Sequence, residues 1–466
     1  MKLNGDKLDS GAASSPVSAG YTGDSALLAV STGKHSVPYT IHIQRGIHQQ
    51  DGYLKSSASV PSLGFGGRIA MDADNLFIAA TGESNCSLAD IGNACANSGA
   101  VYLFTRKGST WTRTGTLKAS LPAKGDRFGS NLALSGSTLA VAAMNQAGCS
   151  DDPGDIGCEK AGAAYIFSRK NGSWSEEKFL KSSSAQAFDA FGSTLSLSGD
   201  TLAVTSLGGI HIFTRKDGVW SEESFLKLSG VGVLDGLGTA ISLAGDSLLI
   251  GVPSDKACDS KPSSFTCDYA GAAYVYTRKD GVWSQEAWLK ASNSEKGDEF
   301  GSAVSILGNV AVIGAPGESS CGASDPYDNL CANAGSAYVF FRGPGGWSEW
   351  SYLKASQPGI GDQFGSTLGI DDNGVVIGAP TESRCNSNVS GQICTSSGAA
   401  YVFVPGTTNW LLNAYVKASN ADSYDLFGLS VGIGGGRIAI GSGDASCGGN
   451  PGDNGCAGAG AVYVFE

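Results

Sequence analysis

Several features that mark other classes of protein are scarce in this 466-residue sequence. No stretch approaches the roughly 18 consecutive apolar residues of a membrane-spanning helix, so membrane insertion is not expected. The formal net charge is −12, whereas binding to nucleic acid needs a basic surface, so nucleic acid is not expected as a partner. Helical periodicity of apolar residues is also missing over any useful length. The chain therefore does not read as a helical, membrane-spanning or nucleic-acid-binding protein.

The sequence also carries little of the usual catalytic equipment. It has four histidines and contains no HExxH, GxSxG or P-loop motif. Two carboxylates could serve a carbohydrate-active enzyme, but the 43 acidic residues are distributed by the repeat described below and single out no pair. We therefore expect a protein that is not an enzyme, with a carbohydrate-active enzyme as the least favoured alternative.

Glycine is abundant instead, at 68 residues, and it recurs within a repeat. The dipeptide Phe-Gly returns six times, and Leu237-Gly238 stands at the same place in one further copy. Successive copies are 63 or 64 residues apart, except for one interval of 46 residues before Leu237. The phenylalanines are Phe65, Phe128, Phe191, Phe300, Phe364 and Phe427. Seven copies in phase make this repeat the main organising feature of the chain.

Each copy predicts four antiparallel strands. Phe-Gly is followed by an alternating run, a second apolar run, a Gly-Ala-x-Tyr-x-Phe segment, and a segment that begins near Trp and ends in Leu-Lys. Alternation with a period of two, bounded by turns such as Ser198-Gly199-Asp200, is typical of hairpins with one buried face. Four-stranded repeats of about 40 to 60 residues are typical of propeller blades. The sequence therefore predicts an all-β fold, a β-propeller of four-stranded antiparallel blades.

Two copies show the repeat most fully. Phe300-Gly301 leads to Gly314-Ala315-Pro316, and Phe364-Gly365 leads to Gly378-Ala379-Pro380. This pattern resembles the FG-GAP repeat of integrin α-subunit propellers and their bacterial relatives, over roughly residues 15 to 466. The resemblance implies a closed propeller that takes part in adhesion or ligand binding.

The number of blades is less clear from the sequence than their type. We expect one domain over residues 1–466, with residues 1–14 as a closing segment, residues 15–64 as a degenerate repeat, and residues 65–466 as seven FG-GAP repeats. The last repeat stops after its third strand, so the N-terminal part of the chain is expected to supply the outer strand. We prefer eight blades, with the outer strand near residues 1–3. The alternative is seven blades, with the outer strand at residues 52–56.

The twelve cysteines fall into six pairs, each separated by nine or ten residues within one loop between the second and third strands. Zinc ribbons bring CxxC knuckles together in fours, which this spacing does not offer, so six local disulfides are predicted. Disulfides persist in oxidising compartments, so the protein is expected to be extracellular, at the cell surface or periplasmic. The pairs are Cys86 with Cys95, Cys149 with Cys158, Cys258 with Cys267, Cys321 with Cys331, Cys385 with Cys394, and Cys447 with Cys456.

In a propeller these loops share one face with the links between blades, and that face is the candidate binding surface. Its candidate ligand-binding residues are acids that follow the second strand, with solvated charge as the alternative interpretation: Glu83, Glu318, Glu382 and Asp444. A second set of acids stands two residues before Phe-Gly, and we interpret it mainly as turn caps that accept backbone N–H bonds. This set is Asp126, Asp189, Asp298, Asp362 and Asp425.

Two further patterns have alternative explanations. The tryptophan near the start of each fourth strand either packs between blades, which we prefer, or contributes to a sugar-stacking ring. The resemblance to integrin-type repeats implies calcium in an acidic loop between the first and second strands, but most copies have only a tight turn there. The remaining candidate calcium ligands are Asp371, Asp372 and Asn373.

Taken together, these patterns predict an extracellular binding or adhesion propeller whose disulfide-bonded loop face binds a protein or a glycan. The alternative is a structural module of a secreted or surface structure that contacts copies of itself.

Overall fold

The computed structural model divides the chain into two compact units, Met1–Ile47 and His48–Glu466, where a single domain was expected. All of its named elements are β-strands, and no helix among the described residues is long and apolar enough to cross a membrane. The structure describes residues 2–3, 6–7, 25–32, 35–42, 50–56, 60–85, 95–150, 152, 154–228, 239–257, 267–322, 326–385, 394–407, 409–444 and 455–466.

The first unit is one four-stranded antiparallel sheet with the strand order β2-β1-β3-β4. The β3–β4 hairpin pairs Leu28 with Tyr39, and β1 joins it by pairing Lys2 with Ala29. The strands are β1 (Lys2–Leu3), β2 (Asp6–Lys7), β3 (Ser25–Thr32) and β4 (His35–His42).

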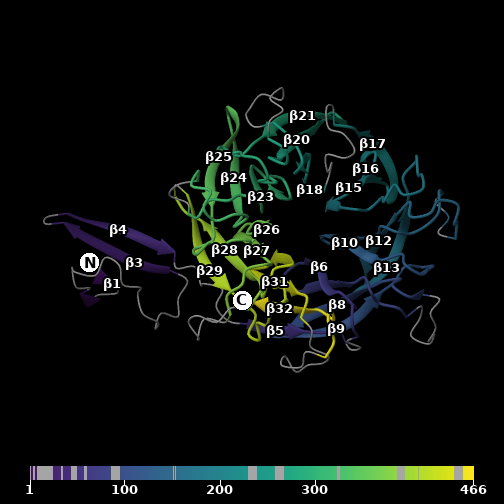
Figure 1. Cartoon of the computed structure of the whole chain (residues 1–466), viewed down its shortest axis with the longest axis horizontal. Helices are drawn as coiled ribbons and strands as arrows, with labels where there is room; N and C mark the ends of the chain where they lie inside the picture. The colour runs from purple at the N-terminus through teal and green to yellow at the C-terminus, as the bar shows by residue number, and fades with distance from the viewer. Residues whose placement is uncertain are drawn as a thin grey trace. The chain divides into compact units, whose positions relative to one another are not determined.

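The second unit is a ring of seven four-stranded blades, visible face-on in Figure 1. From the inner strand outward, blade 1 is β6 (Phe65–Met71), β7 (Asn75–Ala80), β8 (Ala100–Lys107) and β9 (Thr110–Leu117); blade 2 is β10 (Phe128–Ser135), β11 (Thr138–Ala143), β12 (Ala163–Lys170) and β13 (Ser173–Leu180); blade 3 is β14 (Leu195–Ser198), β15 (Thr201–Ser206), β16 (Gly209–Lys216) and β17 (Val219–Leu226); blade 4 is β18 (Ala240–Ala244), β19 (Ser247–Val252), β20 (Ala272–Lys279) and β21 (Val282–Leu289); blade 5 is β22 (Ala303–Leu307), β23 (Val310–Ala315), β24 (Ser336–Gly343) and β25 (Gly346–Leu353); blade 6 is β26 (Thr367–Asp371), β27 (Gly374–Ala379), β28 (Ala399–Pro405) and β29 (Trp410–Val416); blade 7 is β30 (Ser430–Gly434), β31 (Arg437–Ser442), β32 (Ala461–Phe465) and β5 (Gln50–Leu54).

The preference for eight blades was wrong, and the seven-bladed alternative is confirmed. The outer strand of blade 7 is β5, in which Tyr53 pairs with Tyr463 and Leu54 with Val462 of β32. The ring centroids of Tyr53 and Tyr463 lie 5.1 Å apart, and Leu54 is buried. The side chains of β5 therefore pack against blade 7, in addition to the backbone pairing. Lys2 and Leu3 instead pair within the separate N-terminal sheet, and the degenerate repeat does not form a blade of the ring.

Within each blade the middle strands are the most deeply buried. Every residue of β7, β11, β15 and β19 is buried, because the second strand of a blade is covered by the neighbouring blade on each side. The fourth strand, at the rim of the ring, alternates instead, as β9 shows with its exposed and buried positions. The second run of each repeat is continuously apolar because both faces of its strand are buried, whereas the fourth run alternates because its strand is partly exposed.

Neighbouring blades are joined at the Phe-Gly dipeptide. The amide of Phe300 donates to the carbonyl of Ala270, just before the third strand of the preceding blade, at 3.1 Å. The same bond, from Phe65 to Ala459 at 3.1 Å, closes the ring between blades 7 and 1. The side chains of all six Phe-Gly phenylalanines are fully buried. Each dipeptide therefore connects two blades through its backbone and fills the space between them with its ring.

The glycines of the repeat permit this close approach. Gly271 has a φ of +80°, and a Cβ at this position would lie 2.1 Å from the carbonyl oxygen of Phe300. In the Gly-Ala-Pro segment, a Cβ on Gly314 would lie 2.0 Å from the carbonyl oxygen of Gly365 in the next blade. The Phe-Gly and Gly-Ala-Pro segments thus recur together because they contact each other across each junction.

Arginines on the third strands add polar contacts between blades. Arg278 of blade 4 donates to Asp246 of its own blade at 2.7 Å, and to Glu223 and Thr201 of blade 3 at 3.1 Å each. Its guanidinium also lies 5.3 Å from the ring of Trp283. Arg215 repeats this set of contacts one blade earlier.

The recurring tryptophans pack between blades, as we preferred. Trp174 of blade 2 contacts Phe77 of blade 1 edge to face, with ring centroids 5.0 Å apart. Trp111 packs in the core cluster that also contains Leu54 and Val464 of blade 7. These indole groups therefore lie between blades of the propeller and do not form a sugar-binding surface.

The junction between blades 5 and 6 departs from this pattern. Pro405 stands at the position that corresponds to Arg278, and Trp350 stands at the position of its glutamate partner Glu223. The ring of Trp350 lies 6.0 Å from Trp410 and 6.0 Å from Phe341. Phe341 is exposed, as are Leu411 and Leu412 nearby in sequence to Trp410, so the rim here is apolar.

Replacing Gly271 by alanine is predicted to destabilise the protein by at least about 2 kcal/mol, because the new Cβ would combine a positive φ with a backbone clash. Gly345→Ala is the matched control, since a Cβ added to Gly345 would meet no atom within 4 Å. Urea denaturation followed by circular dichroism measures both variants. Equal stability of the two would contradict the role assigned to the inter-blade glycine.

Candidate functional site

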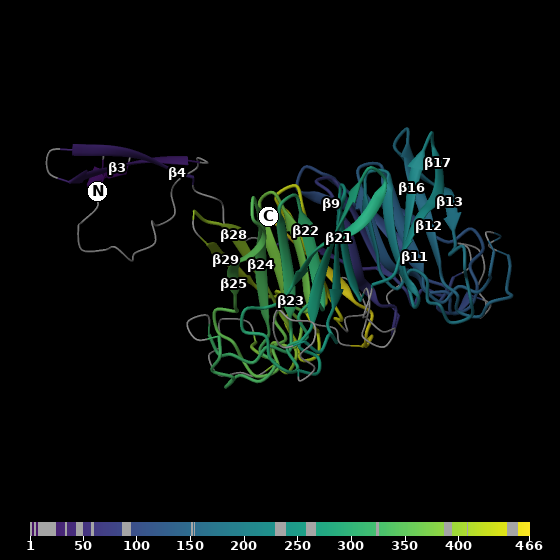
Figure 2. The same cartoon turned by 90° about the horizontal axis from the view of Figure 1, so that it is seen from above.

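The long connections of the propeller lie on one side of the ring (Figure 2). They are the loops between the second and third strands of a blade and the links from one blade to the next, and we call this side the loop face. Backbone bonds join the two kinds of segment, as from Glu299 of a link to the carbonyl of Tyr269 in a loop at 2.8 Å. The links thereby brace the loops of the preceding blade.

Disulfides close these loops at their bases. Cys149–Cys158, Cys321–Cys331 and Cys385–Cys394 are formed, with Cα atoms 5.2, 4.9 and 5.0 Å apart. Cys95, Cys267 and Cys456 are also disulfide-bonded. Their predicted partners, Cys86, Cys258 and Cys447, lie outside the described residues. Three of the six predicted pairs are thus confirmed directly, and blade 3 has only the short Leu207-Gly208 turn in place of a loop.

The aspartates before Phe-Gly cap turns, as we interpreted them. Each accepts the backbone N–H of the residue three positions earlier, at 2.6 or 2.7 Å. Four of the five are buried, all except Asp189. Burial raises the pKa of Asp298 to about 7, against the opposing effect of its backbone bond to Glu295, and nearby negative charge on Glu318 adds to the rise. Burial likewise raises the pKa of Asp425 to about 7.

The four predicted ligand-binding acids are buried, which does not fit the alternative interpretation of solvated charge. Relative exposure is 7% for Glu83, 1% for Glu318, 0% for Glu382 and 1% for Asp444. Each carboxylate lies just after the second strand and is bound by groups at the third strand or at the end of the fourth strand of the same blade. They are therefore internal supports of the loop face, and whether any of them contacts a ligand remains a prediction.

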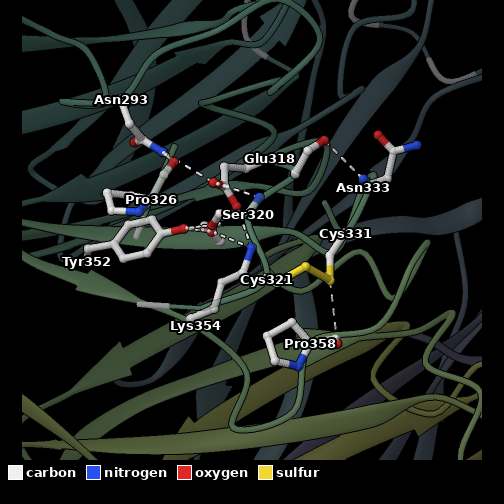
Figure 3. A network of polar contacts seen from close by, with 12 residues as sticks. Asn293, Glu318, Ser320, Cys321, Pro326, Cys331, Asn333, Tyr352, Lys354 and Pro358 are labelled. Atoms are coloured by element: carbon white, nitrogen blue, oxygen red, sulfur yellow. Dashed lines mark hydrogen bonds and ion pairs between the residues drawn. A yellow bond between two sulfur atoms is a disulfide. The ribbon is translucent and has the colours of Figure 1, made fainter. Parts of the chain in front are cut away.

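Glu318 shows this arrangement most completely (Figure 3). Its carboxylate forms an ion pair with Lys354, and it accepts hydrogen bonds from Ser336 Oγ at 2.6 Å and Asn293 Nδ2 at 3.2 Å. Tyr352 reaches the same cluster through Ser336 at 2.9 Å. Burial by itself would raise the pKa of Glu318, but Lys354 and the hydrogen bonds outweigh it and hold the pKa below its usual range. The carboxylate is therefore ionised and fully engaged at the base of the loop.

The other blades repeat this support with variations. Glu382 pairs with Lys417 at 2.7 Å and with Arg384 at 3.3 Å. Glu83 accepts the hydroxyl of Tyr102 at 2.6 Å, and Asp444 accepts the hydroxyl of Tyr463 at 2.9 Å. The equivalent positions in blades 2 and 4 carry Gln146 and Asp255, which the sequence analysis did not select. The recurring Leu-Lys segment could have indicated these support positions in the sequence, because its lysine reaches the end of the second strand in several blades.

Blade 3, which has no long loop, replaces this network. His211 stands where other blades carry tyrosine, and its ring lies between Glu222 at 2.8 Å and Ser206 at 3.0 Å. His211 thus keeps a polar partner at each ring nitrogen even though this blade has no acid after its second strand and no long loop.

The predicted calcium ligands form a turn. Asp371 Oδ1 accepts the backbone N–H groups of Asn373 at 2.8 Å and Gly374 at 3.1 Å, and Oδ2 accepts Asn373 Nδ2 at 3.2 Å. No group of three or more metal-binding side chains occurs among the described residues. The carboxylate of Asp371 is therefore committed to its hairpin, and calcium binding here remains a prediction.

The feature of the loop face that sequence analysis missed is its exposed apolar side chains. Ile156, Tyr269, Tyr327 and Leu330 are exposed on the disulfide-bonded loops, and Phe188, Ile360 and Tyr424 are exposed on links between blades. Leu330 and Ile360 are about three-quarters exposed, at 75% and 76%. Such residues occur outside the regular repeat positions, so nothing in the repeat pattern marks them.

Comparison with known protein families agrees with this architecture. The profile of the family described as FG-GAP repeat matches residues 111–167, 283–340 and 347–403. Each range begins in the fourth strand of one blade and ends in the third strand of the next. No curated protein matches the chain. Matching solved structures include one of the mitotic checkpoint complex, at 8% identity and TM-score 0.48, covering 92% of this chain and 98% of that chain. Another is a candidate 6-phosphogluconolactonase from Bacteroides uniformis, at 10% identity and TM-score 0.44, covering 78% and 88% respectively.

Replacing Lys354 by methionine is predicted to destabilise the protein by about 3 to 5 kcal/mol, because Glu318 would be left buried and unpaired. Adding Glu318→Gln to Lys354→Met should restore more than half of the loss, since the buried charge is then removed. Lys296→Met, at an exposed lysine of a link, is the control and should change stability by no more than about 0.5 kcal/mol. A small effect of Lys354→Met, measured by urea denaturation, would contradict the ion pair as the support of this loop.

Asp298 is predicted to make stability depend on pH. Its pKa is about 7 in the folded protein and about 4 in the unfolded chain, so folding takes up a proton when the pH lies between these two pKa values. The resulting stabilisation is present below about pH 4 and is lost as the pH rises through about 7. Asp298→Asn should therefore lose less stability than the wild type between pH 5 and pH 8, as urea denaturation can measure. Asp189→Asn, at the less buried equivalent of blade 3, is the comparison. Parallel pH profiles of wild type and Asp298→Asn would refute the prediction.

Proposed function

We propose that this chain, an FG-GAP repeat β-propeller, is an extracellular, non-catalytic binding module that holds a protein ligand on its loop face. The proposal includes the absence of enzymatic activity, and a location in a secreted, cell-surface or periplasmic setting. Its location is supported by the disulfides, which persist in oxidising compartments.

The observation that carries the proposal is the set of exposed apolar and aromatic side chains on the loop face. Exposed apolar residues gathered on one side of a soluble protein often mark an interaction surface. Aromatic residues such as Tyr327 and Tyr424 are enriched in protein interfaces, because they bury a large area with few rotatable bonds. Four of the seven positions named above are aromatic, which favours a protein ligand over a highly polar one.

The rigidity of the loop bases supports the same proposal. Disulfides close the loops, and buried pairs such as Glu318 with Lys354 and Glu382 with Lys417 hold the strand ends below them. A surface that is ordered before binding loses less conformational entropy when a ligand binds. The polar groups of these bases are occupied by each other, so we assign them to support and not to chemistry.

The proposal is tested with a triple variant of the loop face, Leu330→Asp with Ile360→Asp and Tyr424→Asp. The control is Val219→Asp with Val282→Asp, two exposed apolar residues at the hairpins on the opposite side of the ring. The oxidised full chain is screened against a panel of extracellular proteins and a glycan array. For a protein that binds, the loop-face variant should lose at least tenfold in affinity, because charge would be buried against apolar surface. The control should bind like the wild type.

Three outcomes would contradict the proposal. Equal binding by the loop-face variant would place the ligand elsewhere, and binding to glycans alone would replace the protein ligand by a glycan. The third outcome concerns self-assembly, which the exposed apolar rim at Phe341, Leu411 and Leu412 favours as a second candidate function. A dimer that forms as concentration rises and is lost in Leu411→Glu, measured by light scattering, would support that candidate instead.

A further inference from the structure

The axis of the ring holds a cavity of about 220 Å³ that is lined by residues from all seven blades. Its lining includes the residue three positions after the phenylalanine, or after Leu237 in blade 4, in every repeat. Six of these seven residues are short: Asn131, Thr194, Ala240, Ala303, Thr367 and Ser430. The seventh is Arg68 of blade 1, so one long cationic side chain stands in a ring of small ones.

Arg68 differs in its surroundings from four arginines that lie on the third strands of blades. Arg106, Arg215, Arg278 and Arg342 each form an ion pair with a carboxylate. Arg68 has no carboxylate partner within the described part of the chain, and its Nη1 donates to the carbonyl of Gly67 at 2.8 Å. The side chain reaches solvent in the cavity, although the surrounding protein displaces enough water to lower its pKa. Arginine nevertheless stays protonated, so within the described residues the cavity holds a positive charge that no carboxylate pairs with.

Three other polar side chains of the cavity, those of Thr367, Ser430 and Asn131, differ in what they offer a ligand. The hydroxyls of Thr367 and Ser430 donate to backbone carbonyls of Gly428 and Gly66, at 2.7 and 2.6 Å. Their protons are used, so these groups offer only lone pairs to a ligand. The amide of Asn131, in the blade next to Arg68, has no hydrogen-bond partner in the described structure and retains two donors. Arg68 and Asn131 therefore place unused N–H donors on the adjacent blades 1 and 2.

We propose that this axial cavity binds a carboxylate group, with Arg68 as its charged partner and Asn131 as a second donor. A guanidinium presents two parallel N–H groups that match the two oxygens of a carboxylate. The aliphatic side chains of Ile69, Leu195 and Ile241 also line the cavity and would contact the carbon skeleton of the ligand. The volume suits one sugar acid or one acidic side chain. This inference goes beyond the loop-face proposal and does not depend on it.

The net charge of −12 disfavours anion binding everywhere except at a local positive charge. The whole molecule repels anions, so binding requires a local cation that no acidic side chain neutralises. The affinity is expected to fall as sodium chloride is added, because the attraction is between an ion and a charged side chain.

The experiment uses the oxidised full chain and two carboxylate probes, D-glucuronate and the peptide acetyl-Gly-Asp-Gly-amide. Their neutral controls are D-glucose and acetyl-Gly-Asn-Gly-amide. Isothermal titration should show binding of at least one carboxylate and of neither control. Stronger binding of glucuronate identifies a free sugar acid as the class of ligand, and stronger binding of the peptide identifies an acidic side chain.

Arg68→Gln should weaken this binding at least tenfold, and Arg68→Lys should weaken it less, because charge is kept while the paired donors are lost. Arg127→Gln, at an exposed arginine of a link, is the control and should bind like the wild type. Binding unchanged in Arg68→Gln, or no binding of either probe, would overturn the proposal.

A second measurement avoids dependence on the folding of a variant. Phenylglyoxal modifies accessible arginines, and the extent of modification of Arg68 in the wild type can be followed by mass spectrometry. The carboxylate that binds should protect Arg68, while its neutral control should not. Equal modification of Arg68 with and without the carboxylate would also overturn the proposal.

Discussion

The junction between blades at the Phe-Gly dipeptide is the contact on which the rest of the propeller depends. A backbone bond from each phenylalanine reaches the preceding blade, and its ring fills the space between the two sheets. Glycines on both sides let the backbones approach to distances that a Cβ would forbid. Because the bond from Phe65 to Ala459 is of the same kind, closure of the ring uses the same contact as every other junction. The loops and the axial cavity take their positions from this repeated geometry.

Two consequences for function follow from how the repeat uses its polar residues. Acids that recur at the same position of each repeat already have partners within the fold: Asp298 accepts a backbone N–H of its turn, and Glu318 forms an ion pair with a lysine. What remains available to a ligand is therefore found where the repeat varies. On the loop face these are apolar side chains such as Leu330 and Ile360, and at the axis it is the single cation of Arg68. The binding module proposed here is thus a regular scaffold with irregular, exposed positions.

Some errors of sequence interpretation have a common physical origin. The degenerate repeat at residues 15–64 suggested an eighth blade, yet its strands β3 and β4 belong to a separate sheet. Local pattern shows that a segment is a strand, but it does not show which strand it pairs with. Glu83, Glu318 and Glu382 were selected as candidate ligand-binding acids because they follow a strand. Their burial depends on lysines and tyrosines from later strands of the same repeat. In both cases the deciding partner lies far away in the chain.

By itself, the sequence determined the blade type, the local disulfides confirmed at Cys149, Cys321 and Cys385, and the capping role of the aspartates before Phe-Gly. These features depend on residues close together in the chain, or on repetition that fixes the same contact many times. Only the tertiary structure decided the number of blades, the burial of the loop-base acids, and the isolation of Arg68 in a cavity shared by seven blades. These depend on closure of the ring, which brings residues together from segments hundreds of positions apart.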